Sequence, residues 1–137
     1  MKKLLVHTDG GARGNPGPSG IGVYITDESG AVVLEHSRYI GETTNNQAEY
    51  TAVIDALEHC KTLGAEEVGF FLDSELVVRQ LNRQYKVRDA GLAPLFMRVW
   101  NLSVSFRKLT FTHVRREFNK NADRLVNEAI DRHLAAK

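Results

Sequence analysis

Hydrophobic and polar residues follow two different patterns along the chain, and the first pattern is that of strands. Three short apolar runs predict strands over residues 4–8, 21–26 and 31–40. The turn sequence Asp27-Glu28-Ser29-Gly30 predicts a hairpin between the second and third runs. Residues 10–22, which are rich in glycine and proline, predict a long loop between the first and second runs. Three strands with such connections predict an antiparallel meander.

From residue 44 the pattern takes the period of helices. The polar residues Thr44-Asn45-Asn46-Gln47 supply N-cap side chains for a helix that reaches about Leu63 and ends at Gly64. Further helices are predicted over residues 74–82, 91–103 and 119–135, strands over residues 68–72 and 109–114, and a polar loop over residues 83–90. Helices that alternate with the later strands favour parallel pairing there. The sequence therefore predicts an α/β fold, a five-stranded mixed sheet flanked by helices, in a single domain of residues 1–137.

Composition narrows the class of protein. A chain of 137 residues suits one domain, and 42% apolar with 26% charged residues excludes a disordered chain. No apolar run approaches the roughly 20 residues of a membrane span, so we expect no membrane partner. The short apolar start ends at His7-Thr8-Asp9, too early for a signal peptide. The single Cys60 excludes an internal disulfide and favours a reducing, cytoplasmic location, and the lack of heptad repeats favours a monomer.

The net charge of +1 hides an asymmetry. Residues 79–116 hold nine of the 18 basic residues and only one of the 17 acidic residues, Asp89. The rest of the chain is correspondingly acidic. A strongly basic segment in a nearly neutral chain indicates a polyanion partner for part of the surface, or a set of solvated helix faces.

Four acidic residues do not fit the pattern of a solvated surface. Asp9 and Asp73 each follow directly on an apolar strand, at the end where open α/β sheets bind ligands. Glu49 and Asp123 extend apolar stripes of their helices, which continue through Val53, Ala56, Leu57 and Cys60 and through Val126, Ile130 and Leu134. Taken singly, turn chemistry or the helix dipole explains each of them. Taken together, they predict four carboxylates at one edge of the sheet.

Carboxylates gathered this closely need a counter-charge, because like charges in one place raise pKa values sharply. Oxygen-only ligands favour Mg²⁺ or Mn²⁺ over zinc, and the chain has no Cys/His cluster with zinc spacing. Two such ions about 3.5–4 Å apart hydrolyse phosphodiesters, one activating water and the other stabilising the leaving oxygen. The residues therefore predict a two-metal phosphodiesterase site.

Four stretches of the chain together resemble ribonuclease HI, the family that cuts the RNA strand of RNA–DNA hybrids. They are His7-Thr8-Asp9-Gly10-Gly11 with Gly14-Asn15-Pro16-Gly17-Pro18, Thr43-Thr44-Asn45-Asn46-Gln47-Ala48-Glu49-Tyr50, Leu72-Asp73-Ser74, and Asn119-Lys120-Asn121-Ala122-Asp123-Arg124-Leu125. They occur in the family's order and cover essentially the whole chain. The short polar region after residue 82 is similar to the compact, archaeal-type branch, which lacks the basic protrusion of other members.

The resemblance implies a sheet order of 3-2-1-4-5 and a role for each carboxylate. Asp9 would bridge two metal ions, Glu49 and Asp73 would each complete one metal site, and Asp123 would serve the ion that binds the attacking water. The residues implied to contact the hybrid are Gly10, Gly11, Asn15, Thr44, Asn45, Asn46 and Arg116. Asn side chains can bond the 2′-hydroxyls that distinguish RNA from DNA, and helix capping is the alternative for Asn45 and Asn46.

Three regions depart from the family's pattern. Where other members have a basic protrusion, this chain offers only Arg79, Arg83, Lys86 and Arg88, and the nearby Trp100 is expected in the core. Many members have a mobile loop His, whereas His113 falls within a predicted strand. Arg116 or Glu117 is then expected near the scissile phosphate, with a surface position as the alternative. Glu75 stands where many members have Gln, and the helix dipole accounts for it.

The sequence thus predicts a Mg²⁺- or Mn²⁺-dependent endoribonuclease that hydrolyses the RNA strand of RNA–DNA hybrids and leaves 5′-phosphate and 3′-hydroxyl ends. Two alternatives share the fold: a non-catalytic hybrid-binding module, and a nuclease that also acts on RNA–RNA duplex. A small-molecule phosphohydrolase is disfavoured by the basic segment and by the lack of a nucleotide-binding motif. No obligate protein partner is expected.

Overall fold

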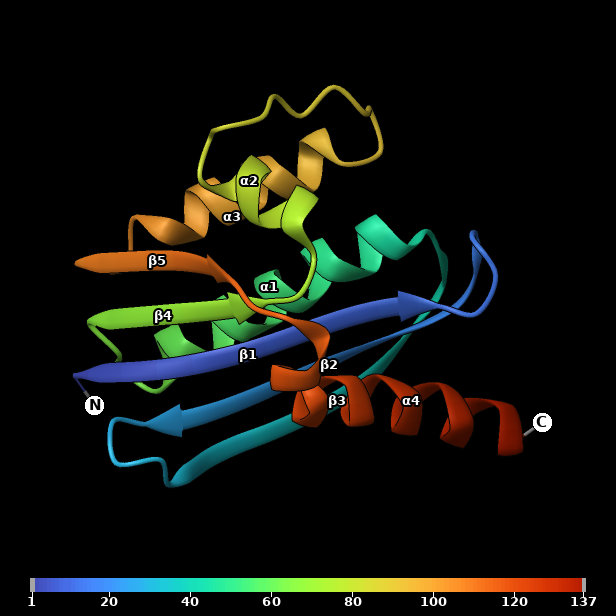
Figure 1. Ribbon diagram of the computed structural model, residues 1–137, viewed down its shortest axis with the longest axis horizontal. Helices are drawn as coiled ribbons and strands as arrows, with labels where there is room; N and C mark the ends of the chain where they lie inside the picture. The colour runs from blue at the N-terminus through green and yellow to red at the C-terminus, as the bar shows by residue number, and fades with distance from the viewer. Residues whose placement is uncertain (1, 137) are drawn as a thin grey trace.

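The computed structural model describes residues 2–136 and contains one five-stranded sheet with the order β3-β2-β1-β4-β5, as predicted (Figure 1). The strands are β1 (Lys3–Ala12), β2 (Gly17–Asp27), β3 (Val32–Thr43), β4 (Glu67–Leu72) and β5 (Lys108–His113). The helices are α1 (Asn45–Thr62), α2 (Glu75–Leu81), α3 (Ala93–Ser103) and α4 (Lys120–Ala135), with a 3₁₀ turn η1 (Arg116–Phe118) before the last. Strands β1 to β3 are antiparallel, and β1, β4 and β5 are parallel.

The helices cover the two faces of the sheet unequally. Helices α1, α2 and α3 lie together on one face, whereas α4 lies alone on the other, across β2 and β3 (Figure 1). The core lies between the sheet and α1, where Tyr50, Leu57 and Phe70 are fully buried. The predicted apolar stripe of α1 is confirmed, because Glu49, Val53, Ala56, Leu57 and Cys60 are all buried. Within the described residues, no helix is long and apolar enough to span a bilayer.

The glycine-rich residues 10–22 were predicted to form a loop, and this is wrong for most of them. Strand β1 continues to Ala12 and β2 begins at Gly17, so only four residues connect them. The glycines serve close packing instead. A Cβ on Gly10 would lie 2.2 Å from the backbone of Ala48 in α1, and one on Gly22 would lie 2.2 Å from the carbonyl oxygen of Ala122 in α4. Only glycine lets the two helices approach the sheet this closely.

Two expectations about buried side chains are also wrong. Trp100 was expected in the core, yet it is 41% exposed. Helix α3 buries only Val99, and the ring of Trp100 beside it lies under the Arg83 guanidinium, 4.3 Å from the ring centroid. In α4 the predicted apolar stripe holds for Val126 and Ile130 but not for Leu134, which is 42% exposed.

Candidate active site

Asp9 and Asp73 come from neighbouring parallel strands. Strands β1 and β4 pair in a register that sets His7 opposite Phe71, and continuing that register sets Asp9 beside Asp73. Asp73 directly follows β4, as predicted, whereas Asp9 lies within β1. Asp9 is buried, and its Oδ1 accepts a hydrogen bond from the N–H of Gly10 at 3.0 Å. The two carboxylates therefore share one edge of the sheet.

Glu49 reaches this edge because α1 begins against β1. A capping box starts the helix: Thr44 Oγ1 accepts from the N–H of Gln47 at 3.2 Å, and Gln47 Oε1 accepts from the N–H of Thr44 at 3.0 Å. Gly10 then admits the backbone at the start of α1, and a Cβ there would lie only 2.5 Å from the nitrogen of Glu49. Sequence-local capping and one glycine thus place Glu49 beside β1.

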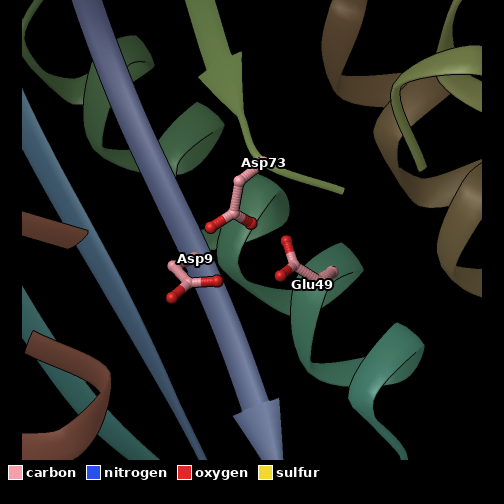
Figure 2. A group of neighbouring side chains, drawn as sticks. All are labelled: Asp9, Glu49 and Asp73. Carbon is pink, nitrogen blue, oxygen red and sulfur yellow. The ribbon is translucent and has the colours of Figure 1, made fainter. Parts of the chain in front are cut away.

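Asp9, Glu49 and Asp73 form a trio of facing carboxylates (Figure 2). One oxygen from each lies within 4.8 Å of the other two. Asp123, from the first turn of α4, lines the same cleft but lies outside this close group. The structure therefore brings all four predicted carboxylates to one cleft of about 470 Å³. Three of them lie close enough to share a metal ion.

Burial dominates the electrostatics of the trio. Burial, reinforced by the charges of Asp73 and Asp123 and opposed by Glu49, raises the pKa of Asp9 to about 7. Burial and then the neighbouring Asp9 raise the pKa of Glu49 well above its usual range. Burial also raises the pKa of Asp73, against the hydrogen bonding of Asn119 and the positive charge of Arg116. The cleft thus holds protons near neutral pH unless a cation takes their place.

The residues of the trio fit a hard divalent cation. Glu49 Oε2 is buried and has no hydrogen-bond partner among the residues that the structure describes. An unpaired buried carboxylate oxygen is unfavourable, and a cation satisfies it. All close ligand atoms are carboxylate oxygens, the donor set that Mg²⁺ and Mn²⁺ prefer.

The predicted substrate contacts divide into cleft residues and supports. Gly10, Gly11, Asn45, Asn46 and Arg116 line the cleft. Among the described residues, Asn15 and Thr44 are not part of the cleft lining.

The supports act through hydrogen bonds. Asn15 Oδ1 accepts from the N–H of Asn45 at 3.0 Å, and Asn45 Oδ1 accepts from the N–H of Ala12 at 2.8 Å. Thr44, and neither Asn45 nor Asn46, caps α1. The Asn45 oxygen is therefore occupied, and its NH₂ group is left as a donor at the cleft.

The two acids that depart from the family's pattern lie away from the trio. Glu75 occupies the first turn of α2 and pairs with Arg79 at 3.4 Å, and Glu117 pairs with Arg115 at 3.6 Å. Within the described part of the chain, neither lines the cleft, whereas Arg116 does. His113 ends β5, as predicted.

Sequence reasoning missed Asn119, which is 1% exposed. An Asn at a predicted helix start is ordinarily read as a cap, yet its side chain makes no cap hydrogen bond. Its Nδ2 instead donates to the carbonyl oxygen of Thr8 at 2.9 Å. Arg13 and Asn127, also missed, line the cleft and bond each other at 3.2 Å. No local sequence signal marks any of these long-range contacts.

Known proteins are similar to this chain in sequence. The reverse transcriptase-like family model matches residues 7–129. A bifunctional protein of Mycobacterium tuberculosis is 40% identical over 94% of this chain but only 36% of its own length, so the chain spans about a third of that relative. A ribonuclease H of Chlorobium phaeobacteroides is 33% identical over 95% of this chain and 97% of its own length.

Solved structures agree. The RNase H1 of the archaeon Halobacterium salinarum superimposes with a TM-score of 0.92 at 39% identity, covering 94% of this chain and 98% of that chain. LC11-RNase H1, in complex with an RNA/DNA hybrid, superimposes with a TM-score of 0.92 at 50% identity, covering 96% of this chain and 99% of that one. On the family match and the near-complete overlap with the Chlorobium ribonuclease H, this chain belongs to the ribonuclease H family.

Proposed function

We propose that this protein is a metal-dependent endoribonuclease that hydrolyses the RNA strand of RNA–DNA hybrids and leaves 5′-phosphate and 3′-hydroxyl ends. The observation that carries the proposal is the buried trio Asp9, Glu49 and Asp73 with its unpaired Glu49 oxygen. Membership of the ribonuclease H family and similarity to an RNase H1 in complex with a hybrid support the substrate class.

Asp9, Glu49 and Asp73 would hold two Mg²⁺ or Mn²⁺ ions, with Asp123 completing the cleft from α4. When bound, such ions supply an activated water and stabilise charge on the leaving oxygen. The protein's own part is to keep the carboxylates in place before the ions arrive. Rigid elements β1, α1 and α4 do this, because glycines let both helices pack directly on the sheet.

The rest of the cleft would bind the hybrid. The NH₂ groups of Asn45 and Asn46 at the start of α1 are suited to donate to 2′-hydroxyls and base edges in the minor groove. Gly10 and Gly11 offer backbone without side-chain obstruction. Arg116 stands in the cleft beside Asp73, where its guanidinium would bind a backbone phosphate.

The test is cleavage of end-labelled substrates. RNA–DNA hybrid, single-stranded RNA, RNA–RNA duplex and DNA duplex are each incubated with Mg²⁺, Mn²⁺ or EDTA, beside Asp9→Asn. We expect cutting of the hybrid's RNA strand in either metal, none in EDTA, and a loss of at least a hundredfold in Asp9→Asn. End-group analysis of the products checks the 5′-phosphate.

Two other outcomes identify the alternatives. Equal cutting of RNA–RNA duplex would widen the substrate class. Salt-sensitive hybrid binding without cutting in any metal would refute the nuclease and indicate a binding module of the same fold.

A further inference from the structure

One buried side chain connects the two sides of the carboxylate cleft. Asn119 lies between η1 and α4, and its Nδ2 donates to the carbonyl oxygen of Thr8 at 2.9 Å. Thr8 immediately precedes Asp9 in β1. The bond therefore ties the start of α4 to the strand residue next to a metal-binding carboxylate, although the two bonded residues are 111 positions apart in the sequence.

Backbone groups of Asn119 hold two more cleft residues. Its N–H donates to the carbonyl oxygen of Arg116 at 3.0 Å, closing the turn η1. Its carbonyl oxygen accepts from the N–H of Asp123 at 3.1 Å, which begins the hydrogen-bond ladder of α4. Three hydrogen bonds from one residue thus fix the backbone beside Asp9, at Arg116 and at Asp123.

Stability alone does not account for an amide at this place. Asn119 Oδ1 is buried and lacks a hydrogen-bond partner within residues 2–136. An unpaired buried amide oxygen is unfavourable, so a site selected only for packing would hold an apolar side chain. The hydrogen bond that the Asn119 NH₂ group donates to Thr8, and not the packing of the side chain, therefore accounts for the amide at this position.

We propose that Asn119 is a positioning residue whose bond to Thr8 sets the spacing between Asp9 and the segment that carries Arg116 and Asp123. The inference rests on the proposed function, because this spacing matters to chemistry only if the cleft acts on a phosphodiester. Loss of the donor releases η1 and the start of α4 from β1. It also removes the hydrogen bonding of Asn119 that lowers the pKa of Asp73. The backbone that carries Asp9, Glu49 and Asp73 stays in place, because it belongs to β1, α1 and the end of β4.

Two variants and a control test the proposal. Asn119→Ala removes the amide, and Asn119→Leu keeps a side chain of similar size without a donor or a charge. Asn82→Ala is the control, since Asn82 Nδ2 donates to the carbonyl oxygen of Phe111 at 3.0 Å, also joining a helix end to a strand, on a different part of the molecule. All are compared at a temperature where each is folded by circular dichroism.

We expect both Asn119 variants to lose at least tenfold in kcat for hybrid cleavage, with KM changed less than twofold, and Asn82→Ala to keep both values. In the metal-free proteins, amide hydrogen exchange over residues 116–123 should accelerate at least tenfold in the Asn119 variants, while exchange at Glu49 is unchanged. If Asn119→Ala does not fold, Asn119→Leu carries the comparison.

Wild-type kcat in the folded Asn119 variants, or unaltered exchange over residues 116–123, would overturn the proposal. A wild-type protein that cuts no hybrid refutes the proposed function instead. The exchange measurement then still decides whether Asn119 tethers α4 to β1.

Discussion

At the scale of single residues, the buried carboxylates of the cleft lower the free energy of unfolding near neutral pH. Asp9 is held where burial raises its pKa to about 7, next to a second buried acid, Glu49. Between the ordinary pKa of 3.8 and this raised value, the folded protein binds a proton that the unfolded chain has released. The free energy of unfolding therefore falls as pH rises through this window, and the loss is complete above it.

Asp9→Asn should accordingly stabilise the metal-free protein. Asparagine keeps the oxygen that accepts from the N–H of Gly10 but does not ionise. We expect the free energy of unfolding in EDTA to rise on the order of 3 kcal/mol at pH 8, with no gain near pH 4. Denaturant titrations at the two pH values measure this, and saturating Mn²⁺ should shrink the gain because it stabilises only the wild type. A wild type as stable as the variant at pH 8 would contradict the electrostatic account.

Single residues also mark where prediction from sequence ends. Asp9, Glu49, Asp73 and Asp123 could be found because each breaks a local pattern, a strand end or an apolar stripe. Asn119 breaks none, since an Asn at a helix start looks like an ordinary cap, and its partner Thr8 lies at the other end of the chain. Trp100 was wrongly predicted to be buried, because the helix α3 buries only Val99. Which side chains of such a helix are covered depends on neighbouring segments that periodicity does not reveal.

At the scale of elements, periodicity sufficed for the order of strands and helices, but not for where β1 ends and β2 begins. Glycine is disfavoured in strands, so residues 10–22 resembled a loop. Local propensity does not include the tertiary contacts of these glycines, which pack against α1 on one face of the sheet and against α4 on the other. The same close contacts set Glu49 and Asp123 at the cleft, so the error in the fold and the geometry of the site have one cause.

Gly22→Ala should reveal this contact. Its Cβ would lie 2.2 Å from the carbonyl oxygen of Ala122, and backbone cannot yield as a side chain does. We expect a loss of roughly 1–3 kcal/mol in the free energy of unfolding by urea titration. Gly69→Ala in β4 is the control, because its Cβ would meet only ordinary contacts at 3.5 Å, and its stability should be unchanged or slightly higher. Equal stability of both variants would refute the close-packing explanation.

At the scale of the whole molecule, the basic segment of residues 79–116 separates into paired and unpaired charges. Arg79, Arg98, Arg107 and Arg115 form ion pairs with glutamates. Across the part of the chain that the structure describes, Arg83, Lys86, Arg88, Lys108 and Arg116 do not. Lys86 and Arg88 are exposed on the loop between α2 and α3, whose end at Gly91 lies against Gln47 in the first turn of α1. Unpaired positive charge thus lies both in the cleft, at Arg116, and on this loop, at Lys86 and Arg88.

Hybrid binding by the Asp9→Asn protein should therefore weaken with salt. Removing two phosphate contacts with Lys86→Gln and Arg88→Gln should lower the slope of log K against log salt by about 1 to 2. Arg98→Gln is the matched control, since Arg98 already pairs with Glu58 at 3.1 Å and should leave the slope unchanged. Fluorescence anisotropy from low to moderate salt measures hybrid binding by the Asp9→Asn protein, the double variant and the Arg98→Gln control. An equal slope in the double variant would show that the hybrid does not contact Lys86 and Arg88.

The chain order of the cleft residues has a consequence for biosynthesis. A ribosome completes β1, α1 and β4, and with them the trio, long before it reaches Arg116, Asn119 and Asp123. Until α4 has been translated, nothing covers Gly20 and Gly22 on the opposite face of the sheet. A nascent chain would therefore contain the three acids of the trio early but complete the cleft late, when the last helix docks.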